Sequence, residues 1–399
     1  MDALTTPSNW QRVRLGDIAE IKRGASPRPI ENPKWFCTNS NVGWVRISDI
    51  SKSSRFLYKT AQKLSKKGIE KSRFIKQNSL IMSMCATIGK PIITKIDTCI
   101  HDGFVVFENP KIDLNYLYYF LCYIEKEWLE SGQQGSQVNL NVDLIKNKEV
   151  FCPKNLNEQI AIANVLSDVD HYLCSLDALI LKKESVKKAL SFELLSQRKR
   201  LKGFNQTWQR VKVKDFGIII TGSTPLTQIS EYWNGTISWI TPTDINDNKD
   251  IFNSERKITQ KGLDTIRMIP KNSVLVTCIA SIGKNAILRV NGACNQQINA
   301  IIPNKDFNAD FIYYLMENNK QYLLGKAGVT ATYIISKQVF EEIDFFVPKD
   351  LDEQAAIANI LSALDSEIIS LKNKKRQFEN IKKALNHDLM SAKIRVLNK

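Results

Sequence analysis

The stretch LNEQIAIANVLSDVD at residues 156–170 returns at residues 351–365 as LDEQAAIANILSALD. Ten of the fifteen positions are identical, and the two stretches lie 195 residues apart in a chain of 399 residues. Self-similarity at so long a period indicates duplication of a domain-sized unit. The repeat therefore predicts two related halves.

Nearly the same spacing relates further pairs of segments, which occur in the same order along the chain. NWQRVRLGDIAEIKRGASPRP from Asn9 matches TWQRVKVKDFGIIITGSTPLT from Thr207, NSLIMSMCATIGK (78–90) matches NSVLVTCIASIGK (272–284), and FCPKNL (151–156) matches FVPKDL (346–351). Two copies of one unit of about 195 residues thus account for essentially the whole sequence.

Each copy consists of two unlike parts. Residues 1–155 and 204–350 carry short β-branched and aromatic runs separated by Gly, Pro, Asn and Asp, which is typical of a mixed domain rich in strands. Short helices are expected within them at 116–124 and 311–316. Residues 156–203 and 351–399 contain no proline, and no glycine before Gly203, so each should be a long helix. The expected fold class is α+β, with two similar mixed α/β heads separated by two long helices.

Both helical parts begin with a capping signal and continue with a coiled-coil pattern. Asn155 with Glu158, and Asp350 with Glu353, have the spacing of a capping box. Beyond it, every third or fourth position forms a seam of eight positions in each copy, of which six are apolar and two are lysine. The seam positions are Val169, Leu173, Leu176, Ile180, Lys183, Lys187, Leu190 and Leu194 in the first copy, and Leu364, Ile368, Leu371, Lys375, Phe378, Lys382, Leu385 and Leu389 in the second. This pattern predicts that the helices pair as an antiparallel coiled coil with an internal pseudo-twofold. The alternative is that each helix lies on its own head.

The composition indicates a soluble protein with a polyanionic partner. The net charge is +15 and the isoelectric point is near 9.3, which favours nucleic acid, although ribosome association or solubility alone would give the same value. No apolar run is long enough to span a membrane, and the N-terminus lacks the pattern of a signal peptide, so we expect a cytoplasmic protein. Eight cysteines without CxxC spacing, and only three histidines, argue for buried thiols and against a metal site.

The spacing of the predicted elements suits a target with two parts. A seam of 25 residues, from 169 to 194, would be about 38 Å long. That length is close to one turn of B-DNA, roughly 34–36 Å. Two similar heads held apart by this distance could read two half-sites of a duplex. The sequence therefore predicts a bipartite reader of double-stranded DNA.

At this point a resemblance to a known family emerges. The alternation of a head with the repeated P-x-x-L-x-E-Q-x-x-I-A-x-x-L helix resembles the specificity subunit of type I restriction-modification enzymes, as do GSTP (222–225), the W-x-x-x-x-D-I segments and ATIGK with ASIGK. The resemblance implies that the heads are target recognition domains and that the helices set the spacing and dock modification subunits, expected to be two, which in turn engage restriction subunits. The first head departs from the pattern, with GASP (24–27) for GSTP and IHDGF (100–104) for NQQIN (295–299).

The sequence gives no sign of catalysis by this chain. The IGK segments lack the first glycine of a phosphate-binding loop, and no GxGxxG or Asn/Asp-Pro-Pro-aromatic motif occurs. We therefore expect no cofactor and no catalytic residue here, with methyl transfer, ATP hydrolysis and cleavage in partner chains. A stand-alone bipartite DNA-binding regulator remains an alternative, as does an enzyme that lacks the usual motifs.

Candidate DNA-binding residues are polar or basic side chains next to glycine-rich turns. They are Lys22, Arg23, Ser26 and Arg28; Lys90 and Lys284 of the IGK turns; Gln133, Gln134, Ser136 and Gln137; Thr221, Ser223 and Thr224; Asn295, Gln296 and Gln297; and Lys326, Thr330 and Thr332. The alternative for each is an ordinary turn or a solvated loop. Trp44 and Trp239 are expected in the core, and Asp49 and Asp244 as residues that hold a loop.

Overall fold

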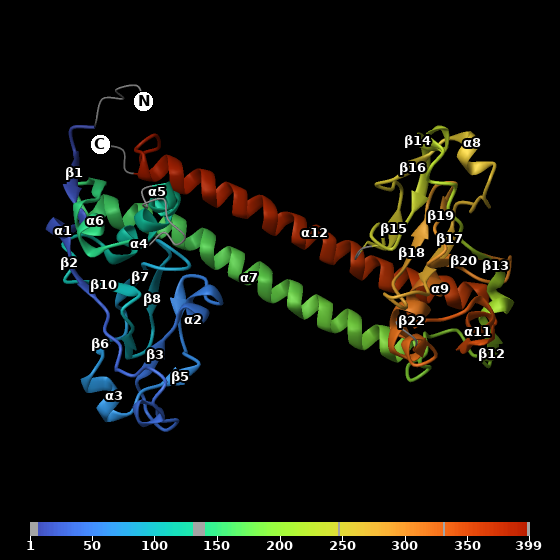
Figure 1. Cartoon of the computed structure of the whole chain (residues 1–399), viewed down its shortest axis with the longest axis horizontal. Helices are drawn as coiled ribbons and strands as arrows, with labels where there is room; N and C mark the ends of the chain where they lie inside the picture. The colour runs from blue at the N-terminus through green and yellow to red at the C-terminus, as the bar shows by residue number, and fades with distance from the viewer. Residues whose placement is uncertain (1–6, 131–139, 246–247, 330–331, 397–399) are drawn as a thin grey trace. The chain divides into compact units, whose positions relative to one another are not determined.

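The computed structural model describes residues 7–130, 140–245, 248–329 and 332–396 (Figure 1). The chain divides into two compact units, Met1–Asp177 with Lys374–Lys399 and Ala178–Asn373. Each unit contains one head and part of each of two 40-residue helices, α7 (Leu156–Leu195) and α12 (Leu351–Met390). The predicted fold class is confirmed.

The first head is built on a five-stranded sheet in the order β2-β10-β7-β8-β4, with a four-stranded sheet β5-β3-β9-β6 and the pair β1-β11. Its elements are β1 (Trp10–Arg14), α1 (Leu15–Ile18), β2 (Glu20–Arg23), η1 (Pro33–Trp35), β3 (Gly43–Val45), α2 (Ile47–Ser51), β4 (Phe56–Leu57), β5 (Gln62–Lys63), α3 (Lys66–Glu70), β6 (Arg73–Ile75), β7 (Leu80–Ser83), β8 (Pro91–Thr94), β9 (Thr98–Ile100), β10 (Phe104–Glu108), α4 (Leu114–Tyr123), α5 (Glu125–Glu130), α6 (Val142–Asn147) and β11 (Glu149–Pro153).

The second head repeats this topology. Its five-stranded sheet has the order β13-β20-β17-β18-β15, beside the sheet β16-β14-β19 and the pairs β12-β23 and β21-β22. Its elements are β12 (Gln209–Lys212), η2 (Val213–Phe216), β13 (Gly217–Thr221), η3 (Ser230–Tyr232), β14 (Trp233–Ile240), β15 (Asp250–Ile251), β16 (Lys257–Ile258), α8 (Gln260–Leu263), β17 (Ser273–Thr277), β18 (Asn285–Leu288), β19 (Gly292–Cys294), β20 (Ile298–Pro303), α9 (Ala309–Asn318), α10 (Lys320–Leu324), β21 (Gly328–Val329), β22 (Tyr333–Ile334), α11 (Lys337–Glu342) and β23 (Asp344–Val347).

The long helices complete the hydrophobic core of each head. In the first unit, Ile162 and Leu166 of α7 and Leu389 and Met390 of α12 are buried in one cluster with the head. In the second unit, Leu194, Leu195, Ile357 and Leu361 have the same role. Burial of a side chain of this kind contributes about 1.5–3 kcal/mol. Both helices therefore contribute to the core of each head, and the alternative that a helix lies on its own head describes just its first turns.

A buried glutamate joins each helix to the N-terminal strand of a head. Glu158 accepts hydrogen bonds from Trp10 Nε1 at 3.2 Å and Arg395 Nε at 3.0 Å, and its side chain is 4% exposed. In the second unit Glu353, 1% exposed, accepts from Trp208 Nε1 at 3.2 Å and Arg200 Nη2 at 3.1 Å.

The predicted helix starts are confirmed, but the capping boxes are wrong. Asn155 and Asp350 cap the amides of residues 157 and 352 at 2.8 and 2.9 Å. The side chains of Glu158 and Glu353 do not bond back to Asn155 and Asp350, because they accept from their Trp and Arg partners instead.

A second repeated contact fixes the head to the helix. Arg55, 6% exposed, donates to Tyr119 Oη and Ser167 Oγ, both at 2.8 Å, and to Asn115 Oδ1 at 2.6 Å. At the equivalent place Lys249 donates to Asp310 Oδ1 at 2.5 Å and Ser362 Oγ at 2.8 Å. The two heads thus use different cations for the same purpose.

Within each unit, α7 and α12 pack side by side and run antiparallel (Figure 1). Leu176, Ile180 and Ile368 are buried in the seam, and Tyr172 packs on Phe378 with the ring centroids 4.6 Å apart. Each seam lysine meets a carboxylate of the opposite helix: Lys382–Asp170 and Lys375–Asp177 in the first unit, Lys183–Glu367 and Lys187–Asp365 in the second. The predicted coiled coil is confirmed, and its lysines are explained by these pairs.

The seam pairs should contribute measurably to stability. We expect Lys183→Glu to lower the free energy of unfolding of the second unit by about 1 kcal/mol, because it places two carboxylates together. Adding Glu367→Lys should restore most of the loss, as read from urea unfolding of the full chain in a double-mutant cycle. Lys182→Glu, at an exposed neighbouring position off the seam, is the control. Equal losses of stability in Lys182→Glu and Lys183→Glu would contradict a stabilising role for the Lys183–Glu367 pair.

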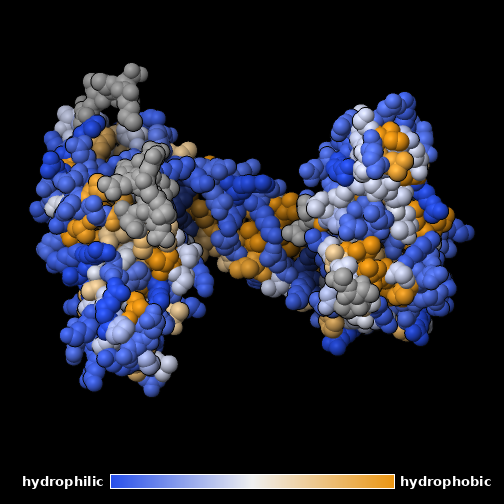
Figure 2. All heavy atoms as spheres, viewed as in Figure 1, coloured by the Kyte–Doolittle hydropathy of each residue, from blue (hydrophilic) through white to orange (hydrophobic). Residues whose placement is uncertain are grey.

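The remaining surface is largely hydrophilic in the view of Figure 2, with separate hydrophobic patches on the heads. No helix among the described residues is long and apolar enough to cross a membrane. Of the cysteines, Cys99, Cys152, Cys278 and Cys294 are buried, and burial raises the pKa of the last two to about 12. The prediction of buried thiols is wrong for Cys37 and Cys174, which are exposed.

Candidate nucleic-acid interface

In the first head, the GASP turn meets the IHDGF segment at Asp102. Ser26 Oγ donates to Asp102 Oδ1 at 2.8 Å, Arg28 Nη2 to Asp102 Oδ2 at 2.7 Å, and Arg23 Nε to the Asp102 carbonyl at 2.7 Å. Gly24 is required here, because a Cβ would lie 2.0 Å from the His101 carbonyl oxygen. Three residues predicted from one segment thus bond to Asp102, two through its carboxylate and one through its backbone carbonyl, and the prediction did not include this residue.

The electrostatics of this cluster keep Asp102 ionised. Partial burial acts to raise the pKa of its carboxyl, but the hydrogen bond from Ser26 and the charge of Arg28 outweigh it and the pKa is lowered. The Arg28 side chain remains 69% exposed, so its guanidinium can also reach an external acceptor. Lys22, the fourth candidate, lies on β2 away from this cluster, where Glu108 at 2.6 Å and Glu20 at 3.0 Å raise its pKa.

The second head brings the equivalent segments together with other side chains. Thr224 Oγ1 bonds to Gln296 Oε1 at 2.5 Å, and Thr221 Oγ1 to Asn299 Oδ1 at 2.7 Å. The backbone amide of Ser223 donates to the Cys294 carbonyl at 2.8 Å. Thr224 and Gln296 form an exposed pair, which suits contact with a base edge.

Asn295, one of the predicted residues, is buried in this structure. It is 8% exposed, and both polar atoms of its side chain bond to Gln297. Asn295 Nδ2 donates to Gln297 Oε1 at 2.9 Å, and the backbone N–H of Gln297 donates to Asn295 Oδ1 at 3.1 Å. Asn295 therefore shapes the segment that presents Gln296, and does not itself face outward. Gln297 is half-buried in the same contact.

The two IGK turns have the same backbone but different surroundings. Lys90 donates to the carbonyl oxygens of Ile50 at 3.0 Å and Ser53 at 3.1 Å, so a phosphate contact would require breaking both bonds. A Cβ at Gly89 would lie 2.3 Å from Trp128 Cδ1, so the close approach serves packing inside the head. The Lys90 ammonium is thus occupied inside the head, and its contact with DNA stays a prediction. Lys284, by contrast, is exposed, and its ammonium has no ion-pair or hydrogen-bond partner among the described residues.

The predicted glycine-rich loops are only partly described. Gln133, Gln134, Ser136 and Gln137, and also Thr330, lie outside the described residues. In the second head β21 and β22 pair antiparallel, and β22 contacts the ASIGK turn, since the Ala280 backbone N–H donates to the Tyr333 carbonyl at 3.0 Å. Thr332 is exposed beside β22, and the Lys326 ammonium lies 5.0 Å from the centroid of the Tyr322 ring.

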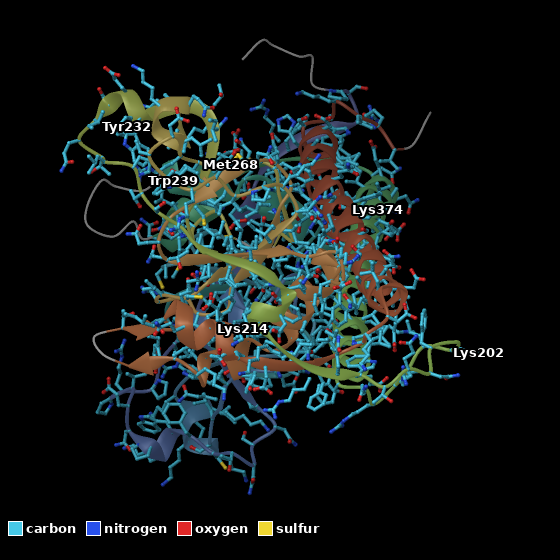
Figure 3. The ribbon with its side chains drawn as sticks, turned by 90° about the vertical axis from the view of Figure 1, so that its right-hand side faces the viewer. Lys202, Lys214, Tyr232, Trp239, Met268 and Lys374 are labelled. Atoms are coloured by element: carbon cyan, nitrogen blue, oxygen red, sulfur yellow. The ribbon has the colours of Figure 1, made fainter. Side chains whose placement is uncertain are left out.

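The repeated tryptophans and aspartates have the expected structural roles. Trp44 is fully buried and Trp239 is 2% exposed, and Figure 3 shows Trp239 in the lobe that carries Tyr232 and Met268. Asp49 accepts from the amides of Arg46 at 2.9 Å and Ala61 at 3.0 Å. Asp244 accepts from the amides of Thr241 and Glu255, both at 2.8 Å. Both carboxylates hold loops, as predicted.

Sequence reasoning missed Asp102, Arg55, Lys249 and the two buried glutamates. A signal existed for the glutamates, because Glu158, Glu353 and their partners Trp10 and Trp208 all recur in the repeat. No such signal existed for Asp102, which aligns with Gln297 and so lies at a position that differs between the heads.

Two similar heads on paired helices, each with a polar turn, form an internally duplicated fold. The chain belongs to the type I restriction modification DNA specificity domain family, which matches residues 7–183 and again 205–380. This match favours the specificity subunit over the stand-alone regulator.

Among its relatives, the chain is 36% identical over 182 residues to the type I restriction enzyme MjaIX specificity subunit of Methanocaldococcus jannaschii, covering 44% of this chain and 41% of that protein. It is 25% identical over 270 residues to the EcoR124I/EcoR124II specificity subunit of Escherichia coli, covering 65% of each chain. These matches therefore span less than two thirds of either relative.

The fold has a solved counterpart. The S subunit of a type I restriction-modification system from M. genitalium superposes with a TM-score of 0.61 and 14% sequence identity, covering 97% of each chain. At this level of identity, the likeness is one of fold.

Proposed function

We propose that the chain is the DNA-reading subunit of a cytoplasmic type I restriction-modification complex. Residues 1–155 and 204–350 are the readers, and residues 156–203 and 351–399 set their spacing. The observation that carries this proposal is that both heads assemble the same two segments with different side chains. Arg28 and Asp102 of the first head stand where the second has Leu226 and Gln297. One scaffold with two sets of donors and acceptors suits an interrupted double-stranded DNA target with two unlike halves.

The proposed complex contains two modification subunits, which methylate adenine, and restriction subunits, which hydrolyse ATP and cleave DNA. Exposed apolar side chains at equivalent helix starts support two docking places: Leu156 is 52% exposed and Leu351 is 41% exposed, with Ile160 beside the first at 37%. Single exposed apolar residues are common on protein surfaces, so the support comes from the recurrence of this exposure at the equivalent start of both helices. The chemistry then resides in these partners, and this chain selects the DNA sequence at which they act.

The test is a map of N6-methyladenine at single-base resolution, made in cells that carry the modification gene, with and without the gene for this chain. We expect an interrupted motif that disappears on deletion. Exchange of one head for that of a relative should change one half of the motif and leave the other intact. An unchanged map in the presence of active methyltransferase would overturn the proposal.

A point variant sharpens this test at the level of one residue. Arg28→Gln in the assembled complex should weaken DNA binding about tenfold. If Arg28 reads a base, the map should relax at one position of one half-site; if it contacts phosphate, affinity should fall uniformly and the salt dependence should decrease by about one charge. Lys182→Gln, on the exposed face of α7, is the control. Unaltered affinity, salt dependence and map would exclude Arg28 from the interface.

A further inference from the structure

The small sheet of the first head, together with η1 and α3, forms a lobe with a large excess of positive charge. Its sheet is β5-β3-β9-β6, and Figure 1 shows α3, β3, β5 and β6 gathered in this lobe, which has a small hydrophobic cluster of its own. Residues 30–76 contain eleven Lys and Arg against three Asp and Glu, a net charge of +8. The whole chain carries +15, so this segment supplies more than half of the excess. We call residues 30–76 the basic lobe.

The positive charge of the basic lobe is exposed and uncompensated. Eight of its lysines are exposed, and none of their ammonium groups pairs with a carboxylate in the part of the chain that the structure describes. Exposed charge of one sign, without compensating acids, attracts a partner of opposite charge. The eight are Lys34, Lys52, Lys59, Lys63, Lys66, Lys67, Lys71 and Lys76.

The basic lobe is bonded to the GASP turn, which carries candidate DNA-binding residues of this head. Trp35 Nε1 donates to the Pro29 carbonyl at 2.8 Å, at one end of the turn. Ser72 Oγ donates to the Ala25 carbonyl at 2.6 Å, inside the turn. Two separate parts of the lobe thus contact the turn, so a duplex that meets the turn lies next to the lobe.

The second head has the same backbone at this place without the charge. In the first head Ser65 Oγ donates to the Lys34 carbonyl at 2.7 Å. In the second, Thr259 Oγ1 donates to the Glu231 carbonyl at 2.6 Å, so a glutamate stands where the first head has a lysine. The equivalent segment, residues 228–270, contains five Lys and Arg against six Asp and Glu, a net charge of −1. The fold therefore does not require the positive charge.

We propose that the basic lobe holds the phosphate backbone of DNA next to the half-site of the first head, and that the second head has no equivalent contact. This inference rests on the proposed function and assigns most of the salt dependence of DNA binding to one head. A lysine that contacts a phosphate releases counterions from DNA, so the affinity falls as salt rises. The second half-site is then bound mainly through base contacts such as those of Thr224 and Gln296.

The experiment exchanges charges at three equivalent positions of the two heads. Ser65 caps α3 as Thr259 caps α8, and counting from these caps aligns the two helices. The loss variant is Lys34→Gln with Lys66→Gln and Lys71→Gln, and the gain variant is Glu231→Lys with Gln260→Lys and Thr265→Lys. The affinity of the assembled complex for a duplex that carries the methylation motif is measured by fluorescence anisotropy over a series of salt concentrations.

The two variants should change the affinity in opposite directions. The loss variant should bind at least about tenfold more weakly, and the slope of log K against log salt should become less steep by about 2 to 3, since each phosphate contact contributes about 0.9. The gain variant should bind more tightly with a steeper slope. The methylation motif should stay the same in both, because phosphate contacts carry no sequence information.

The control is Lys182→Gln with Lys199→Gln and Lys202→Gln, which removes the same charge from exposed positions outside the heads. A loss variant with the wild-type slope, or with no greater change than the control, would overturn the inference while an unchanged motif upholds the proposed function. An RNA duplex is titrated in parallel, and dependence on the three lysines for RNA alone would also overturn it. Failure of the proposed function shows differently, as a methylation map that does not depend on this chain, and it removes the inference too. Thermal unfolding of each variant checks that both units remain folded.

Discussion

Glu353→Ala is expected to lower the free energy of unfolding of the second unit by about 3 kcal/mol. Glu353 is 1% exposed, and the substitution leaves Trp208 Nε1 without its acceptor and Arg200 without its carboxylate. Glu353→Gln retains an acceptor for the indole and should lose about half as much. The measurement is urea unfolding of the full chain, followed by a probe that reports on the second unit.

The matched control lies one residue away. Asp352 is exposed on the outer side of the same helix, and Asp352→Asn should change stability by no more than about 0.5 kcal/mol. Glu158→Ala should reproduce the effect of Glu353→Ala in the first unit, because Arg395 and Trp10 stand in the same relation to it. A loss at Glu353 no greater than that at Asp352 would show that the buried ion pair does not hold the helix to the head.

Arg55→Ala is expected to destabilise the first unit by a similar amount, about 3 kcal/mol. The guanidinium makes three hydrogen bonds, to Tyr119, Ser167 and Asn115, and lies 4.8 Å from the ring centroids of Phe56 and Tyr119. Removing it takes away the donor that Tyr119, Ser167 and Asn115 share, and with it a polar link between the head and α7. In the proposed complex, methylation should also decline at targets whose first-head half-site is already weak.

The second head provides a matched rescue for this variant. Arg55→Lys alone gives an ammonium without a carboxylate, but Arg55→Lys with Asn115→Asp recreates the Lys249–Asp310 pair of the second head. The double variant should recover most of the stability that the lysine variant loses. Lys52→Ala, nearby and exposed, is the control. Failure of the double variant to improve on the single one would mean that the two contacts are not equivalent.

The architecture was predictable because it depends on hydrophobic patterns that occur in both copies of the repeat. The seam of α7 and α12, the strand-rich heads and their short helices follow from periodicity, which a single sequence contains. The duplication strengthened each assignment: Trp44 and Trp239, or Asp49 and Asp244, are more convincing as pairs than either member alone.

The interface was less predictable because it depends on which side chains meet across the sequence. Ser26 and Arg28 are adjacent to a glycine turn, but only the fold places Asp102 between them, 74 to 76 residues away. Lys90 and Lys284 occupy equivalent positions, yet the first is tied to Ile50 and Ser53 and the second is exposed. Equal motifs therefore do not imply equal availability, because neighbouring segments decide whether a side chain is occupied.

The seam lysines also restrict how the helices can change in length. One inserted residue rotates all that follow by about 100°, which would turn a lysine such as Lys183 away from its carboxylate. Seven inserted residues shift the face by only about 20° and add about 10.5 Å, provided that the opposite helix gains a matching insertion. Lengths that keep the charge pairs thus come in discrete steps. Any distance between half-sites that these helices set would therefore evolve by jumps, through paired insertions, and not by gradual drift.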